Sequence, residues 1–466
     1  MGTLFRIFPQ TPTNEDSMPA EIIEVSSPLH SMGPGPSDDR MKVIVPVGKP
    51  RAYGMHKDKN GYPYVYLPPW DGPVYEPAVP DEDGNFLQYD DIDDPRFHAT
   101  HTYASIRFTL DVWEKYYGRT IEWYFKDYYD KAEVVIIPDF ENAQIGRGFI
   151  EIGADVNDED GTISPFTLNF DVISHEVGHG ILFSEIGEPD ADKETSEFLG
   201  FQESGADIIS MISILHFDSV IDEVLELTSG NLYLANHLNR FAETSSVEQI
   251  RMASNSSKLS EFTNGWKDSH KLAQPLTGAI FDILVDIFHE ELVRVGAISA
   301  NLEQISDLLE GSEEYGEQLQ DDFNLAYATH AELFRESLIY ARDVLATLLI
   351  ETWERLSPNY LHYTGIEQAM LNADRAVFDS LYADIIKVNF KWRDIGSAKV
   401  GPRLPKDKSD GPDHGGHKGK KHKMNGLNEN LSDREDNRDD VINEPNYRGP
   451  RRKSYAKRYR EARACE

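Results

Sequence analysis

Cysteine is nearly absent from this chain. The only one among 466 residues is Cys465, which rules out an intramolecular disulfide and argues against a metal site built on thiolates. No apolar run approaches the roughly 18 residues that a membrane-spanning helix needs, and the first residues lack an apolar stretch followed by a small-residue cleavage site. We therefore expect no membrane insertion, and a protein that is either cytoplasmic or exported by a leaderless route.

Positive charge is also scarce over most of the chain. Lys and Arg number 46 against 81 Asp and Glu, which gives a net charge of −35. Residues 401–466 hold 17 basic and 12 acidic residues, so they carry +5 while residues 1–400 carry −40. An acidic body repels nucleic acid and anionic membrane surfaces. We expect neither as a partner.

Composition and periodicity divide the chain into five segments. The charged share of 27% is ordinary and the hydrophobic share of 39% is somewhat low, which is typical of a soluble protein with disordered parts. The expected segments are a flexible leader (1–40), a short β-rich segment with an acidic linker (41–94), a mixed β/α lobe (95–185), a mainly α-helical lobe (186–395) and a disordered basic, histidine-containing tail (396–466).

Two histidines lie four residues apart in the sequence His175-Glu176-Val-Gly-His179. On a helix this spacing puts both imidazoles on one face, one turn apart. Such a pair can bind one Zn²⁺, with the intervening glutamate close to the metal. The alternative is a buried helix that happens to carry two histidines, and the pattern arises by chance in roughly a few per cent of chains this long. The motif therefore indicates a zinc site.

A catalytic zinc site needs three protein ligands and one open position. Glu203 lies 24 residues after His179, in a second apolar helix predicted from residue 201 onward. Asp207 is one turn later on the same face, where it can accept the N–H of a ligating histidine and fix its tautomer. Unpaired carboxylates in an apolar helix would cost several kcal/mol. Each acid therefore needs a cation or hydrogen-bond partners, and a structural salt bridge is the alternative.

These residues resemble the thermolysin-like gluzincin metallopeptidases, over about residues 95–390. The resemblance implies an α+β, two-lobed fold with a catalytic zinc ion in the cleft between a mixed β/α lobe and a helical lobe. It also implies peptide-bond hydrolysis, with Glu176 as the general base. The matching motifs are Asp171-x-x-x-His175-Glu176-x-x-His179-Gly180 and Glu203-x-x-x-Asp207.

Further site residues follow from the resemblance alone. Asn142 and Ala143 correspond to the edge strand that pairs with the substrate backbone. Arg251 corresponds to the arginine that contacts a substrate carbonyl, and His270 to the histidine that stabilises the tetrahedral intermediate. Residues 41–94 would then correspond to a short pro-segment.

The sequence departs from the family in two respects. No tyrosine lies between Gly180 and Glu203, where the family places an oxyanion donor. The acidic cluster for calcium is not recoverable after Glu203, so calcium binding has no support in the residues. We expect a zinc-dependent endopeptidase that acts on polypeptides. Two alternatives stay open: a catalytically inactive, peptidase-like binding protein, and a metal-dependent hydrolase of a non-peptide bond.

Overall fold

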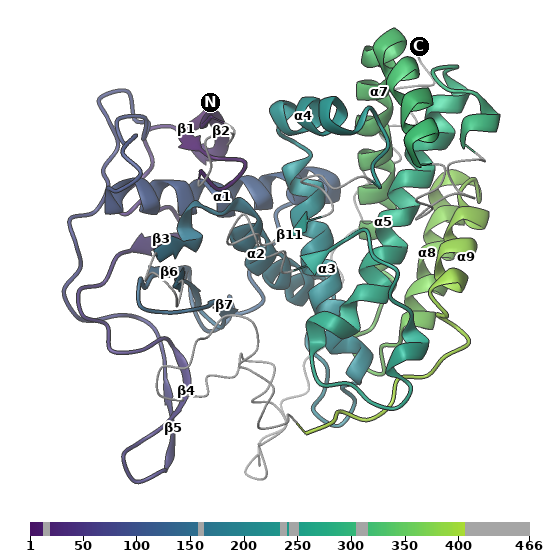
Figure 1. Ribbon diagram of the computed structural model, residues 1–466. Helices are drawn as coiled ribbons and strands as arrows, with labels where there is room; N and C mark the ends of the chain where they lie inside the picture. Colours follow the sequence, from purple (N-terminus) through teal and green to yellow (C-terminus); the bar gives the residue numbers. More distant parts are fainter. Residues whose placement is uncertain (13–18, 157–162, 234–239, 242–250, 304–315, 406–466) are drawn as a thin grey trace.

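The computed structural model describes residues 1–12, 19–156, 163–233, 240–241, 251–303 and 316–405 (Figure 1). Its small sheets and many helices make the fold α+β, as predicted. The strands are β1 (Gly2–Ile7), β2 (Glu21–Pro28), β3 (Met41–Ile44), β4 (Gly54–Lys57), β5 (Pro63–Tyr66), β6 (Ala132–Ile136), β7 (Ala143–Gly146), β8 (Phe149–Ile152), β9 (Ala154–Val156), β10 (Ile163–Pro165), β11 (Arg240–Phe241) and β12 (Arg251–Met252). The helices are α1 (Pro95–Tyr117), α2 (Phe170–Glu185), α3 (Ser196–Ile214), α4 (Asp218–Thr228), α5 (Ser269–Arg294), α7 (Gly316–Trp353), α8 (Tyr363–Phe378) and α9 (Ala383–Trp392), with 3-10 turns η1 (Phe166–Leu168) and η2 (Leu259–Phe262).

A four-stranded sheet in the order β3-β6-β8-β7 forms the centre of the strand-containing half. The first three strands are parallel, and β7 runs antiparallel to β8 at one edge. Side chains of β6 alternate between two hydrophobic clusters. Val134 and Ile136 pack in the main core with α1 and α2, whereas Val135 packs on the other face with Tyr53 and Phe149. Both faces of the sheet are therefore covered, which suits its continuous apolar strands.

The N-terminal segment differs from the predicted flexible leader. Strands β1 and β2 pair antiparallel, and Phe5 and Ile7 are fully buried. The ring of Phe5 stacks on Phe86 and Tyr103 at centroid distances of 4.9 and 5.3 Å. The segment is rich in proline and serine, which led to the wrong prediction. Side chains of Gly2–Ile7 nevertheless alternate between more and less buried positions, as in a strand with one face against the core, and this strand packs against α1.

The helical half lies on the other side of α2 and α3, where α5, α7, α8 and α9 pack together (Figure 1). One hydrophobic cluster contains residues from Phe5 to Ile395 and so runs through both halves. The division into two lobes stays a prediction. Among the described residues, none of the helices is both long and apolar enough to cross a membrane. Of the predicted tail, residues 406–466 lie outside the described part.

Candidate metal centre

Helices α2 and α3 cross at small residues, and this crossing brings the motif residues together. A Cβ on Gly178 would lie 2.8 Å from the Cα of Ala206, and one on Gly205 would lie 2.7 Å from a methyl carbon of Leu182. Each helix begins at a capped residue. The side chain of Asn169 accepts from the N–H of Val172 before α2, and Thr195 caps α3 in the same way. Since Gly178 lies between the two histidines, the close approach fixes their distance from α3.

Three side-chain atoms converge where the helices cross. Nε2 of His175 lies 3.1 Å from Nε2 of His179, and Oε2 of Glu203 lies 3.4 and 3.6 Å from these two nitrogens. All three residues are buried, with 5 to 9% of their surface exposed. Within the described residues this is the group of histidine and acidic side chains that could hold a metal ion. The structure therefore unites the three residues that the sequence proposed as ligands.

The triangle of these atoms fits one face of a tetrahedral zinc site. Zinc binds histidine nitrogen at 2.0–2.1 Å and carboxylate oxygen at a similar distance. Atoms at two corners of such a tetrahedron are about 3.3–3.4 Å apart. The three observed separations, 3.1, 3.4 and 3.6 Å, scatter closely around this value. The donor set and its spacing thus match a zinc ion with a fourth position left for water or substrate.

Acceptors behind the histidines orient both rings. Nδ1 of His175 lies 2.9 Å from Oδ1 of Asp207, and Nδ1 of His179 lies 3.5 Å from Oε1 of Gln202. A neutral ring in each place carries its proton on Nδ1 and turns the lone pair of Nε2 to the centre of the triangle. Two lone pairs and a carboxylate oxygen then face one another in a buried site. A cation between them, either a metal ion or a proton taken up by His179, would satisfy these atoms.

Electrostatics at the centre favour an ionised carboxylate. Burial alone would raise the pKa of Glu203, but the neighbouring His270 together with His175 and His179 outweighs burial and holds this pKa well below its usual value. Burial lowers the pKa of His179, whereas Glu203 raises it more strongly, so the net pKa is raised. Glu176 adds to that rise, which places its charge near the same ring. Glu176 itself is partly exposed, next to the buried ligands.

The first turn of α5 contributes two side chains to the rim. Nδ1 of His270 lies 2.8 Å from Oε2 of Glu203, and 41% of the His270 side chain is exposed. The hydroxyl of Ser269 donates to the other oxygen of Glu203 at 3.3 Å. His270 therefore contacts the same Glu203 oxygen that faces His175 and His179. Sequence reasoning missed Gln202 and Ser269, although each is the chain neighbour of a predicted site residue, Glu203 or His270.

Strand β7 lies beside α2 at the free edge of the sheet, where the sequence placed substrate binding. Helix residue Gly180 leaves room for Ile145, because a Cβ there would lie 2.7 Å from the Ile145 side chain. The carbonyl of Asn142 accepts from the N–H of Gly153, toward β8. In an antiparallel pair, residues whose N–H and C=O groups bond to the neighbouring strand alternate with residues whose groups point away from it. Because Asn142 bonds to Gly153, the N–H and C=O groups of Ala143 and Ile145 point away from β8. This edge can accept an added strand.

The structure describes the backbone of Arg251 alone. Its backbone belongs to β12, which pairs with β11. Its side chain lies outside the described part of the structure. The predicted contact with a substrate carbonyl stays a prediction.

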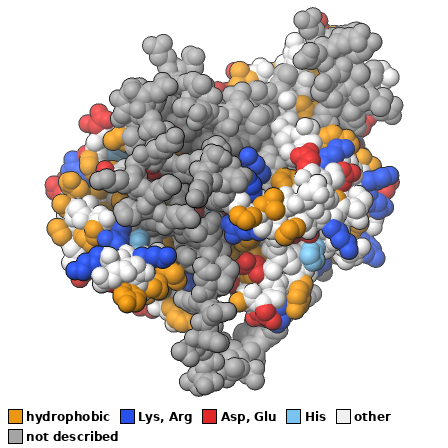
Figure 2. Space-filling view, turned by 60° about the horizontal axis from the view of Figure 1, so that its bottom comes forward, with side chains coloured by type: hydrophobic (Ala, Val, Ile, Leu, Met, Phe, Trp, Pro, Cys, Tyr) orange, Lys and Arg blue, Asp and Glu red, His pale blue; other side chains and the backbone are white. Residues whose placement is uncertain are grey.

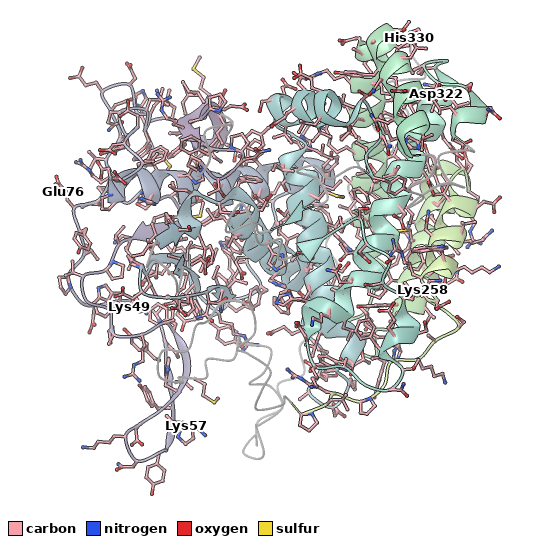
Figure 3. The ribbon with its side chains drawn as sticks, in the orientation of Figure 1. Lys49, Lys57, Glu76, Lys258, Asp322 and His330 are labelled. Carbon is pink, nitrogen blue, oxygen red and sulfur yellow. The ribbon has the colours of Figure 1, made fainter. Side chains whose placement is uncertain are left out.

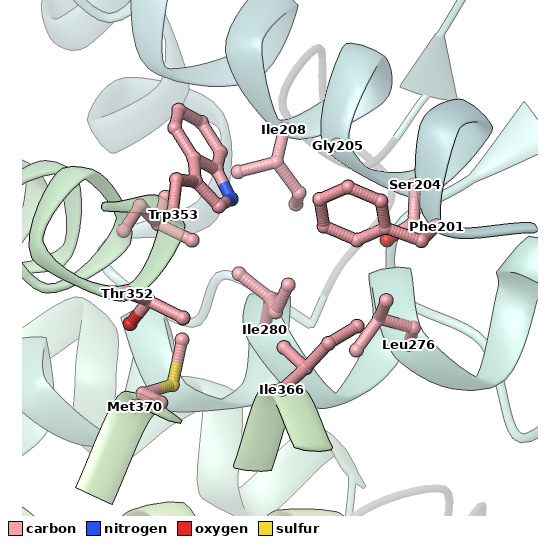
Figure 4. A pocket seen from close by; sticks show the side chains of 11 residues that line it. Phe201, Ser204, Gly205, Ile208, Leu276, Ile280, Thr352, Trp353, Ile366 and Met370 are labelled. Carbon is pink, nitrogen blue, oxygen red and sulfur yellow. The ribbon is translucent and has the colours of Figure 1, made fainter. Parts of the chain in front are cut away.

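A small cavity lies behind the metal centre, between α3, α5, α7 and α8 (Figure 4). Its volume of about 10 Å³ is room for about one water molecule. Its walls are mainly apolar, formed by side chains such as Phe201, Ile280 and Trp353. The cavity is too small to bind a substrate and belongs to the packing of the helices.

Comparisons with known proteins give little further evidence. No family model matches the sequence, and no curated protein matches it. Among solved structures the chain is similar to one described as "Precursor of Protealysin, Metalloproteinase from Serratia proteamaculans". The identity is 12%, the TM-score is 0.40, and the match covers 72% of this chain and 84% of that chain. A TM-score of this size supports no conclusion, so the inferred function rests on the residues of the site.

Proposed function

We propose that this chain is a zinc-dependent endopeptidase. The observation that carries the proposal is the triangle formed by Nε2 of His175, Nε2 of His179 and Oε2 of Glu203, with edges of 3.1 to 3.6 Å. A zinc ion held there would supply Lewis acidity toward a carbonyl oxygen and a water molecule. The remaining groups act through hydrogen bonds and proton transfer.

Each neighbouring residue has a role that its position permits. Glu176 follows the first ligand and is partly exposed, so it takes a proton from water and delivers it to the leaving amine. The outward N–H and C=O groups of Ala143 and Ile145 bind the substrate as an added strand, whereas the carbonyl of Asn142, the other residue of the predicted pair, faces β8. His270, on the rim, is assigned to stabilising the negative charge that develops on the carbonyl oxygen. Arg251 is assigned to a neighbouring substrate carbonyl.

The test uses zinc analysis and casein hydrolysis on the same purified full-length protein. Native protein should hold about one zinc ion per chain and lose hydrolysis with a chelator. Glu176→Gln should keep the zinc and lose hydrolysis by roughly 10²- to 10⁴-fold. Glu226→Gln, at an exposed position of α4, is the control and should behave like the native protein.

Each alternative predicts a different result in the same assays. Zinc with no hydrolysis of casein by the native protein would indicate a binding protein. Hydrolysis of a chromogenic ester without hydrolysis of casein would indicate a hydrolase of a non-peptide bond. Full casein hydrolysis by Glu176→Gln would exclude Glu176 as the general base.

A further inference from the structure

A β-hairpin projects from the sheet on the face opposite α1 and α2. We call residues 51–67 the arm; it contains β4, β5 and their turn (Figure 1). Strands β4 and β5 pair from Gly54↔Tyr66 to Lys57↔Pro63. The turn is closed by Asp58, whose carboxylate accepts from the N–H groups of Asn60 and Tyr62. Lys49 lies where the arm joins the body and Lys57 lies near the tip (Figure 3).

The base of the arm is tied to the edge strand β7. The Lys49 ammonium lies 2.9 Å from Oε1 of Glu151 and 3.6 Å from the centre of the Tyr53 ring, and both charged side chains are almost fully buried. The N–H of Tyr53 donates to the same carboxylate. From β7, the amide of Gln144 donates to Glu151 at 2.7 Å and to the carbonyl of Tyr53 at 3.2 Å. The arm is therefore hydrogen-bonded at its base to β7, the strand that we propose binds the substrate.

Beyond its base the arm exposes large apolar side chains. Tyr62 is 70% exposed, Val65 48% and Leu67 51%. Four of the 20 exposed large hydrophobic residues in the described part of the chain lie in the arm. A local concentration of exposed apolar side chains is typical of a binding site, and a two-stranded hairpin has little core of its own to stabilise it. These features suit the arm to binding a partner rather than to packing in the core.

The charge of the arm is opposite to that of the chain. Arg51, Lys57 and Lys59 against Asp58 give the arm +2, whereas the whole chain carries −35. The Arg51 guanidinium lies 5.8 Å from the Tyr64 ring centre, and the His56 ring is 5.7 Å from the same ring. Seen from the end toward which the arm points, hydrophobic and basic side chains are exposed side by side (Figure 2). Such a surface is complementary to a chain that carries apolar groups and carboxylates.

We propose that the arm binds extended, acidic polypeptide segments outside the site of cleavage. Among the described strands, β4 and β5 pair with each other alone, so their outer edges offer backbone hydrogen bonds, and the exposed apolar and basic side chains offer the matching contacts. A nucleic acid would meet the same basic groups, but the −35 charge of the chain opposes its binding. That the bound polypeptide is a substrate rests on the proposed peptidase function. The binding itself does not.

The test measures the fluorescence anisotropy of a labelled poly(Glu-Tyr) copolymer mixed with the full-length Glu176→Gln protein, which should not digest it. In this background the triple change Tyr62→Ser, Val65→Ser, Leu67→Ser should raise the Kd about fivefold or more, and so should Lys57→Glu with Lys59→Glu. The control changes Leu325, Leu381 and Val388 to serine, which are 62 to 70% exposed in the helical half; its Kd should stay within about twofold of the parent.

Three outcomes would overturn the proposal. Arm variants could bind the copolymer as tightly as the parent, or the control could lose as much affinity as the arm variants. A single-stranded oligodeoxythymidylate could also bind more tightly than the copolymer, which would make the arm a nucleic-acid surface. Thermal unfolding of each variant shows whether it is folded. If casein is not hydrolysed while the arm variants lose binding, the peptidase function fails and the binding surface stands.

Discussion

Replacing Gly178 by alanine tests whether the helix crossing sets the metal site. The new Cβ would lie 2.8 Å from the Ala206 Cα and 3.2 Å from the Ala206 Cβ. Carbon atoms in contact prefer about 3.5–4.0 Å, so α2 and α3 must separate by roughly 0.7 Å. Metal sites tolerate ligand distances within about ±0.2 Å. Overpacking of this kind costs about 1–3 kcal/mol, which predicts a loss of zinc affinity of roughly five- to 150-fold.

The assay is competition for zinc against a chromophoric chelator, together with urea denaturation of the zinc-free protein. Gly365→Ala is the matched control, since Gly365 is also helical and a Cβ there meets nothing within 4 Å. Alanine favours a helix over glycine by about 1 kcal/mol, so the control should keep its zinc affinity and gain stability. The reasoning is refuted if Gly178→Ala binds zinc as tightly as Gly365→Ala does.

Two further predictions concern side chains that support the fold and the site. Asp207→Asn should reduce zinc affinity by about 10- to 100-fold in the same competition assay, because the acceptor behind His175 loses its charge; unchanged affinity would show that Asp207 does not act on the ligand. Burial lowers the pKa of His101 to about 3, whereas an unfolded histidine titrates near 6.5, so its neutral form contributes stability that is lost as pH falls from about 6.5 toward 3. His101→Gln should flatten this loss in urea denaturation measured across that range, and an unchanged pH slope would contradict the assignment.

Local spacing was sufficient to predict which three side chains of the candidate metal centre come together. His175 and His179 share a face as soon as their segment is helical, because they are four residues apart. Glu203 and Asp207 share a face of a second helix for the same reason. The triangle itself depends on Gly178 and Ala206, a contact between helices that no spacing reveals. Gln202 and Ser269 were missed for the same reason, since each is defined by what it faces across the crossing or from α5.

Strand pairing was harder to predict than helix position. Residues 41–94 were predicted to be rich in strands, but the parallel pairing of β3 with β6, about 90 residues away in the chain, was not predicted. Within the same segment, β4 and β5 form a hairpin around Asn60-Gly61, a dipeptide typical of such turns. A turn is encoded by adjacent residues, whereas a parallel pair depends on the connection between its strands and on the helix that covers it.

The central claim is that two imidazoles and one carboxylate of this chain bind zinc. X-ray absorption at the zinc edge of the purified full-length protein tests it directly, with a variant in which His414, His417 and His422 are alanine as the control for the tail. We predict one zinc ion with two imidazole nitrogen ligands and oxygen ligands at about 2.0–2.2 Å. The tail variant should give the same spectrum, and His179→Ala should lose this coordination. A spectrum with a different number of imidazoles, or one that changes with the tail and not with His179, would contradict the claim.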